Sequence, residues 1–225
     1  MGKSDDVMKD IVGNQANKKT LPENEVKDLL KKYNIPTTKY AVVQKEDELN
    51  KIKLDFPLAV KVCSPSILHK TDVGGVKLNV QNIDELKCAF KEMRSKFPKE
   101  NILIESMEKT GLEIIVGVIN DQTFGLSLMV GLGGIFTEVL SDVSFRVIPI
   151  TKNDAEGMLG ELKGKKLLEG FRGMKVNRDA VVNLLLQTSK LAEDFEGKLD
   201  QMDLNPVFVR EKDVCVVDAK MILRA

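Results

Sequence analysis

The only histidine of the chain, His69, lies in a loop that is rich in turn-forming residues and ends in two glycines. The loop reads Ser64-Pro-Ser-Ile-Leu-His69-Lys-Thr-Asp-Val-Gly74-Gly75-Val76. Glycines let a backbone approach a ligand closely, and imidazole is a neutral nucleophile or a cation within the physiological pH range. The loop therefore suits covalent chemistry at His69, although a solvated loop histidine without a function is the alternative interpretation.

A lysine interrupts the apolar run that precedes this loop, Phe56 to Cys63. Alternation along a strand places Lys61 on the face opposite to Leu58, Val60 and Val62. Lys61 then either faces solvent or projects into a cleft, where its ammonium group could hold a phosphate.

Oxygen-bearing side chains gather in the last predicted hairpin, residues 201–223. If residues 210–213 form its turn, counting back from both ends places Asn205 opposite Asp218, within about 5.5 Å. Asp203 lies two residues from Asn205 and shares its face of the sheet. Such oxygens suit a hard cation such as magnesium. Polar residues on a solvated sheet face are the alternative, and the cross-strand register makes us favour the metal site.

The composition limits the function classes that remain. The chain has 225 residues, with 34 basic and 34 acidic side chains, so a dominant nucleic-acid or membrane surface is disfavoured. Cys63, Cys88 and Cys215 are widely spaced and no CxxC pair is present, which disfavours a zinc site and fits a reduced, cytoplasmic protein. We find no signal peptide and no apolar run long enough to span a bilayer.

Helical and strand periodicities alternate along the chain and place these residues. Residues 1–20 predict a loose arm or a short helix. The predicted helices are 22–34, 47–54, 83–97 and 179–195, with mixed short helix and turns over 153–173. The predicted strands are 40–43, 56–63, 76–80, 101–107, 112–119, 125–130, 144–150, 201–209 and 214–223. Glycines at 131, 133 and 134 could aim backbone N–H groups at an anion, but they match neither a Walker A loop nor a Rossmann fingerprint.

Together these motifs resemble the ATP-grasp fold, and more closely the beta subunits of ADP-forming acetyl-CoA synthetases, relatives of succinyl-CoA synthetase. The resemblance runs from about Leu21 to the C-terminus. The segments that carry it are Phe56-Pro-Leu-Ala-Val-Lys61, the His69 loop, Gly131-Leu-Gly-Gly-Ile-Phe-Thr-Glu138, Asp203-Leu-Asn-Pro206 and Val217-Asp218-Ala-Lys220.

The resemblance implies an α+β fold with two lobes and the nucleotide between them. We expect an N-terminal arm (1–20), an N-terminal lobe with the His69 loop (21–103) and a C-terminal lobe with the metal site (104–225).

The resemblance also implies a role for each site residue. For the nucleotide, it implies phosphate contact by Lys61, the adenine hinge at Glu105 and Met107, ribose binding by Glu113, and further contact by Gly74 and Gly75. For the reaction, it implies magnesium binding by Asn205 and Asp218, a phosphohistidine at His69, and support of a partner's phosphohistidine by Asp203. Glu138 and Arg146 lie in motif segments and receive no role.

The family reaction interconverts acyl-CoA, ADP and phosphate with acid, CoA and ATP. No GxGxxG sequence follows a strand here, so we expect the CoA and acyl sites on an alpha-type partner subunit, in an α2β2 assembly. Two other functions stay open: an ATP-grasp carboxylate–amine ligase, which would need no phosphohistidine, and a non-catalytic nucleotide-binding regulatory subunit.

Overall fold

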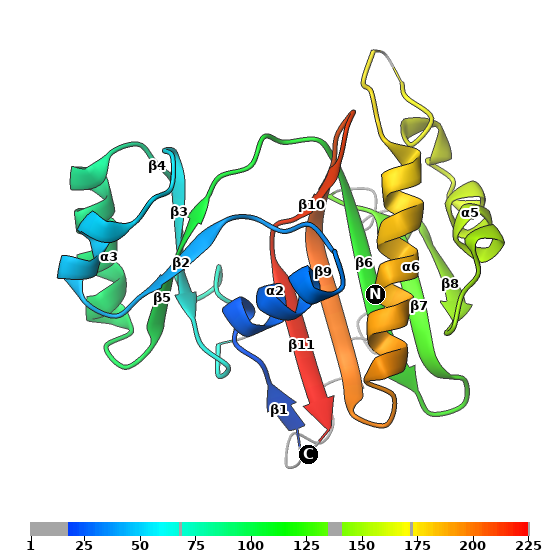
Figure 1. The fold of residues 1–225 in the computed structure, drawn as a ribbon, viewed down its shortest axis with the longest axis horizontal. Helices are drawn as coiled ribbons and strands as arrows, with labels where there is room; N and C mark the ends of the chain where they lie inside the picture. Colours follow the sequence, from blue (N-terminus) through cyan, green and yellow to red (C-terminus); the bar gives the residue numbers. More distant parts are fainter. Residues whose placement is uncertain (1–17, 68, 135–140, 172, 225) are drawn as a thin grey trace, which may run out of the picture.

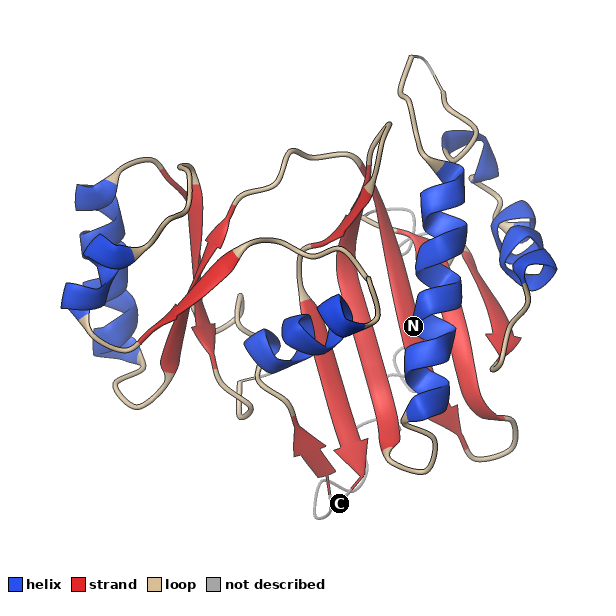
Figure 2. Ribbon diagram, in the orientation of Figure 1, coloured by secondary structure: helices blue, strands red, loops and turns tan. Residues whose placement is uncertain are grey.

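The computed structural model describes residues 18–67, 69–134, 141–171 and 173–224, which form two β-sheets with helices packed around them (Figures 1 and 2). The larger sheet has the strand order β1-β11-β9-β6-β7-β8, and β10 also pairs with β9. Its strands are β1 (Lys18–Thr20), β6 (Leu112–Asp121), β7 (Gly125–Leu132), β8 (Val143–Val147), β9 (Leu199–Val209), β10 (Val214–Val216) and β11 (Ala219–Arg224).

The smaller sheet has the order β2-β5-β3-β4, and its neighbouring strands are antiparallel. Its strands are β2 (Tyr40–Val43), β3 (Leu58–Cys63), β4 (Val76–Val80) and β5 (Asn101–Ser106). The helices are α2 (Glu23–Lys32), α3 (Ile83–Lys96), α5 (Lys152–Glu161) and α6 (Arg178–Asp194), with the 3-10 helices η2 (Glu46–Lys51) and η3 (Lys165–Leu167).

Local sequence explains the long helices. The Asn82 side chain accepts a hydrogen bond from the N–H of Glu85 and so caps the start of α3. Leu86, Phe90 and Met93 follow at helical spacing and are buried against the small sheet. Helix α6 begins in the same way, because the Asn177 side chain accepts from the N–H of Ala180.

Each sheet has its own apolar core. Alternate residues of β6, β7 and β9 pack with α2, α5 and α6 into one large cluster. A second cluster lies between the small sheet and helix α3. Figure 1 shows the small sheet standing between α3 on one side and helix α2 with the large sheet on the other. Helix α2 therefore lies where the two sheets meet.

The structure differs from the expected lobes at the start of the chain. Residues 18–20 form strand β1, which pairs with β11, while residues 1–17 lie outside the described part. Val26 and Leu30 of helix α2 pack into the core of the large sheet, although we expected this helix in the N-terminal lobe. The expected boundary after residue 103 falls within β5 of the small sheet.

The predicted pairing of Val209 with Val214 is confirmed. The expected strand 214–223 is instead divided into β10 and β11, because Val217 and Asp218 leave the regular ladder. The pairing nevertheless continues as counted, since the N–H of Asn205 donates to the carbonyl of Asp218 at 3.1 Å. Within the described residues, no helix is long and apolar enough to cross a membrane.

Candidate functional site

Helix α2 presents different chemistry to the two sheets. Val26 and Leu30 lie one turn apart and face the large-sheet core. Glu23 and Lys27 also lie one turn apart, and their charged groups form an ion pair of 3.0 Å. Both charged side chains are buried. The helix thus brings a carboxylate and an ammonium group into the junction between the sheets.

Lys61 reaches this junction from the small sheet. Its neighbour Val60 faces the α3 core, so strand alternation turns Lys61 towards helix α2. Its Nζ lies 2.6 Å from Glu105 Oε2 and 3.2 Å from Glu23 Oε1, and it donates to the Val217 carbonyl at 3.1 Å. All six residues of β3 are buried. Of the two alternatives for Lys61, the solvent-facing one is therefore excluded, because the second face of β3 is covered by α2.

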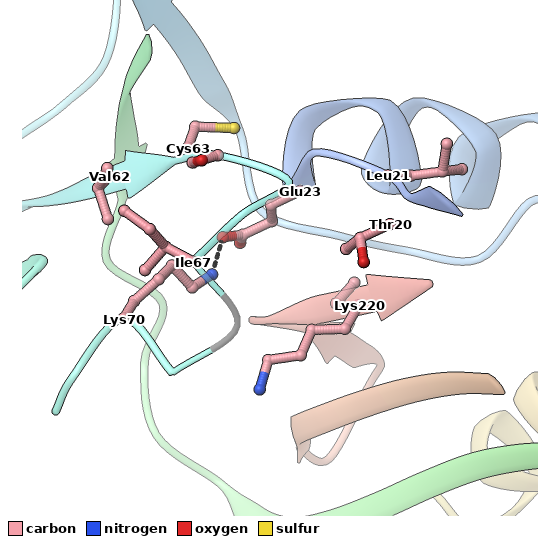
Figure 3. A pocket seen from close by; sticks show the side chains of 10 residues that line it. Thr20, Leu21, Glu23, Val62, Cys63, Ile67, Lys70 and Lys220 are labelled. Carbon is pink, nitrogen blue, oxygen red and sulfur yellow. Dashed lines mark hydrogen bonds and ion pairs between the residues drawn. The ribbon is translucent and has the colours of Figure 1, made fainter. Parts of the chain in front are cut away.

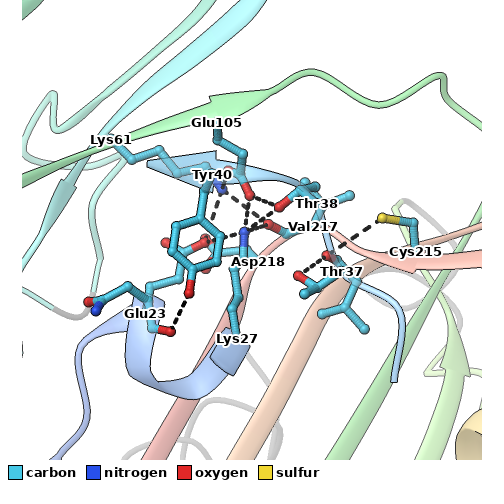
Figure 4. Close-up of polar contacts among 12 residues, drawn as sticks. Glu23, Lys27, Thr37, Thr38, Tyr40, Lys61, Glu105, Cys215, Val217 and Asp218 are labelled. Atoms are coloured by element: carbon cyan, nitrogen blue, oxygen red, sulfur yellow. Dashed lines mark hydrogen bonds and ion pairs between the residues drawn. The ribbon is translucent and has the colours of Figure 1, made fainter. Parts of the chain in front are cut away.

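Lys27 is the most enclosed ammonium group of the junction, with no exposed surface. It donates to Thr38 Oγ1 at 2.8 Å and to the Val217 carbonyl at 2.9 Å, and it forms an ion pair with Glu105 (Figure 4). Burial lowers the pKa of Lys27 to about 8, against the opposing effect of Glu23. Burial alone would raise the pKa of Glu23, but the surrounding lysines hold it well below its usual value.

Lys70, the residue after His69, extends this network to the predicted metal site. Its Nζ forms an ion pair with Glu23 and lies 2.9 Å from Asp218 Oδ1. Burial lowers the pKa of Lys70, but Glu23 and Asp218 outweigh it, and the net shift is upward. Beside Lys70 and Glu23 lies a cavity of about 20 Å³, which has room for about one water molecule (Figure 3).

We call Glu23, Lys27, Lys61, Lys70, Glu105 and Asp218 the junction network. It contains three carboxylates and three ammonium groups, so its formal charge is balanced. Its members come from α2, β3, the His69 loop, β5 and the β10–β11 connection. Because the charges balance, each ammonium group and each carboxylate of the network has at least one partner of opposite charge.

The double glycine fixes the downstream end of the His69 loop. The N–H of Gly75 donates to the Lys70 carbonyl at 2.7 Å, and Gly74 has a φ of +65°. A Cβ on Gly75 would lie 2.5 Å from Val62 Cγ1, so only glycine allows this close approach to β3. His69 itself is exposed. The loop therefore offers an accessible imidazole on an anchored base.

The predicted metal residues lie on the open face of the large sheet. Asn205 is exposed, and the Asp218 side chain is 24 % exposed. Asp203 lies opposite Lys220 in the β9–β11 pairing. Burial raises the pKa of Asp203, Lys220 lowers it and Asp218 raises it, with a net upward shift. The strand register thus brings Asn205, Asp218 and Asp203 to the same region of one face of the large sheet.

The predicted adenine and ribose residues lie in β5, directly after it and in β6. The Glu105 carboxylate is held by Lys27 and Lys61, so it is engaged within the junction network. Met107 follows β5, and its N–H donates to the Pro57 carbonyl at 3.1 Å. Glu113 is exposed on β6, and its carbonyl accepts a hydrogen bond of 2.7 Å from the N–H of Gly133, next to the β6–β7 ladder.

Arg146, one of the two motif residues without a role, does not join this site. Arg146 lies on β8, at the opposite edge of the large sheet from β1, and forms an ion pair of 2.5 Å with Glu161. Glu138 lies outside the described residues.

Sequence reasoning missed four residues of the site: Glu23, Lys27, Thr38 and Lys70. A Glu and a Lys four residues apart are common on solvated helix faces, so the spacing of Glu23 and Lys27 carries no distinctive signal. Lys70 could have been singled out by its position next to His69.

The donor set fits magnesium in the way that enzymes of phosphoryl transfer hold it. Among the described residues, no three His, Cys, Asp or Glu side chains form a cluster that would bind a metal alone. Mg²⁺ is usually held by one or two carboxylates together with substrate phosphates and water. Asp218 and the amide oxygen of Asn205 supply hard oxygens of this kind, and a nucleotide would supply the others.

Comparisons with known proteins identify the family of the chain. The ATP-grasp domain family matches residues 13–223. Subunit beta of acetate–CoA ligase (ADP-forming) I from Pyrococcus furiosus is 41% identical, over 93% of this chain and 94% of its own. Acetate–CoA ligase (ADP-forming) II from Archaeoglobus fulgidus is 44% identical over 90% of this chain, which spans about 30% of that longer protein.

A solved structure shares the fold over nearly the whole chain. The dinucleotide-forming acetyl-coenzyme A synthetase 1 of Ca. Korarchaeum cryptofilum aligns with a TM-score of 0.80 and 37% identity, over 99% of this chain and 100% of that one. That complex contains coenzyme A and Mg-AMPPCP, and its phosphohistidine segment points towards the nucleotide-binding site. The predicted resemblance is confirmed: the chain belongs to the ATP-grasp family, among the beta subunits of ADP-forming acetate–CoA ligases.

Proposed function

We propose that this chain is the nucleotide-binding subunit of an ADP-forming acetyl-CoA synthetase that interconverts acetyl-CoA, ADP and phosphate with acetate, CoA and ATP. The observation that carries the proposal is the convergence of Lys61, Asp218 and the His69 loop where the two sheets meet. A cation for phosphate, oxygens for a metal and an accessible imidazole are the parts that phosphoryl transfer through histidine needs.

In the proposed site the nucleotide lies between the two sheets. Lys61 contacts its phosphates by exchanging one of its present carboxylate partners for a phosphate oxygen. Glu105 near the end of β5 and Met107 in the β5–β6 connection form the adenine hinge, and Glu113 holds the ribose. Gly74 and Gly75 let the loop backbone approach the phosphates. Asn205 and Asp218 hold magnesium, which would neutralise phosphate charge.

His69 performs the covalent step. In the ATP-consuming direction a neutral imidazole nitrogen attacks the γ-phosphorus, a nitrogen–phosphorus bond forms, and the bond to the β–γ bridging oxygen breaks to release ADP. In the ATP-forming direction ADP attacks the phosphohistidine and the imidazole leaves. An exposed side chain on an anchored loop suits this role, because it must reach two different groups.

The CoA and acyl sites belong to an alpha-type partner in this proposal, in an α2β2 assembly. Longer relatives match this chain over only about 30% of their length, which supports a second functional unit. Asp203 would then support a phosphohistidine presented by the partner. The isolated chain should bind ATP and make no acetyl-CoA, and added alpha-type subunit should restore the full reaction.

Labelling with γ-³²P-ATP and Mg²⁺ tests the covalent step. We expect label on the wild-type chain that is acid-labile and base-stable, as phosphohistidine is, and none on His69→Ala. Ser64→Ala and Ser66→Ala are matched controls in the same loop and should retain the label. Label that survives in His69→Ala, or that is stable to acid, would remove His69 from the reaction.

A further inference from the structure

Lys70 connects two parts of the site that act in different steps of the proposed reaction. It directly follows His69 along the chain, and its ammonium group lies 2.9 Å from Asp218 Oδ1. His69 is exposed, whereas Lys70 is only 7% exposed. The proposed phosphate carrier, which is exposed, is thus adjacent in sequence to a buried side chain that contacts a proposed metal ligand.

The Lys70 ammonium group and a metal ion compete for the same carboxylate. Mg²⁺ binds oxygens at about 2.0–2.1 Å in a near-ideal octahedron. A divalent ion on Asp218 would therefore stand within a few ångströms of the Lys70 ammonium, where like charges repel strongly. The Lys70–Asp218 ion pair and an Asp218-bound Mg²⁺ are then alternative states.

Glu23 makes the exchange of partners inexpensive. Lys70 already forms an ion pair with Glu23, so loss of Asp218 does not leave a buried ammonium group unpaired. The backbone hydrogen bond from Gly75 to the Lys70 carbonyl stays on the downstream side. A shift of the Lys70 side chain is therefore transmitted mainly to His69, its upstream neighbour.

We propose that Lys70 is a positioning residue that competes with Mg²⁺ for the Asp218 carboxylate and thereby couples metal–nucleotide binding to the position of the His69 loop. Without the metal, Lys70 holds the base of the loop against Asp218. With the metal–nucleotide complex in place, that contact is lost and the loop takes a second position. This inference rests on the proposed function, because it uses Asp218 as the metal ligand.

Calorimetry measures the competition directly. The metal effect is defined as the ratio of ADP affinity in Mg²⁺ to ADP affinity in EDTA. Removing the competing ammonium in Lys70→Gln should raise this ratio about fivefold or more, a usual size for coupling between sites. Lys70→Arg keeps the ion pair with Asp218, so its metal effect should stay near the wild-type value. Lys220→Gln removes a cation from the same sheet face, without the Asp218 contact, and should change the ratio less than twofold.

The single histidine supplies a second readout that does not depend on turnover. In tag-free protein with histidine ¹³C-labelled at Cε1, the imidazole Cε1–H gives one NMR signal. Adding Mg²⁺ to the ADP-saturated wild type should shift this signal. In Lys70→Gln the signal should already lie near its metal-bound position, and Mg²⁺ should shift it little.

The outcomes separate the inference from the proposed function. If ADP binds the wild type but the metal effect and the His69 shift are the same in Lys70→Gln, the coupling is refuted and the proposed function stands. If Lys220→Gln matches Lys70→Gln, general charge explains the effect and the ion-pair competition is refuted. If the wild type binds no ADP in either condition, the proposed function fails and the inference with it.

Discussion

At strands β3 and β5, both faces of the small sheet are buried, but one face is apolar and the other is charged. On one face, Leu58, Val60 and Ile104 pack against Phe90 and other apolar side chains of helix α3. The other face carries charged groups of the same strands, Lys61 and Glu105, towards Glu23 and Lys27 of helix α2. These four charged residues are each at most 5% exposed.

The difference divides stability and function between the faces. Apolar burial contributes about 25 cal/mol per Å² whether or not a ligand is present. Buried ion pairs contribute much less, because desolvation offsets most of their attraction. In the proposed reaction, however, their groups would change partners when a phosphate or a metal binds. The α3 face therefore holds the sheet together, and the α2 face prepares the site. Four substitutions test this division.

The largest effect is expected at Asp218. Asp218→Ala should lower Mg²⁺-dependent labelling of His69 by about 1,000-fold or more, because the proposed metal stabilises charge in the transition state. The melting temperature should change little, since the side chain is partly exposed. Quantitative labelling measures the loss of phosphorylation at His69, and a thermal melt measures the melting temperature. Normal magnesium dependence in this variant would place the metal elsewhere.

The apolar face should show the opposite behaviour. Phe90→Ala in helix α3 should lower the free energy of unfolding by about 3–5 kcal/mol, since it leaves a cavity in a buried cluster. The folded fraction should still bind ADP with unchanged affinity. Denaturant unfolding and calorimetry measure the two quantities, and a loss of affinity with intact folding would contradict the division between the faces.

Breaking the charged face from one side should also destabilise the fold. Lys27→Met should cost about 3–5 kcal/mol, because it leaves the Glu105 carboxylate with less compensation in a buried place. The double variant Lys27→Met with Glu105→Gln should recover part of this loss. Lys96→Met, which removes an exposed ion pair with Glu92, is the control and should leave the unfolding curve unchanged. No recovery in the double variant would mean that packing, and not charge, dominates at Lys27.

The smallest effect is a pH dependence at Glu23. Its pKa in the folded chain is lowered from 4.5, so its stabilising contribution is present above pH 4.5 and is lost as the pH falls below it. Glu23→Gln should be about 3 kcal/mol less stable than the wild type at pH 7. That difference should narrow between pH 4.5 and pH 3. Glu25→Gln, on the exposed side of the same helix, should run parallel to the wild type. A stability difference between Glu23→Gln and the wild type that is constant with pH would show that ionisation of Glu23 does not contribute to stability.

Much of this architecture was determined by the sequence alone. The spacing of apolar residues predicts helices α3 and α6, because burial of one helical stripe is a local property. The turn between Val209 and Val214 sets the register that brings Asn205 opposite Asp218, because strand pairing continues residue by residue from a hairpin. The His69 loop and the closing Asp218 segment also predict the family that the comparisons confirmed.

Only the tertiary structure decided which charges meet. Lys27 and the Val217 carbonyl are 190 residues apart, and no local pattern indicates that they form a hydrogen bond. Glu23 and Lys27 have the spacing of a solvated helix pair, and Lys61 that of a sheet residue facing solvent. They are buried because helix α2 packs its apolar stripe on one sheet and its charged side on the other. Such long-range contacts depend on how the sheets are placed, which nearest-neighbour preferences along the chain do not encode.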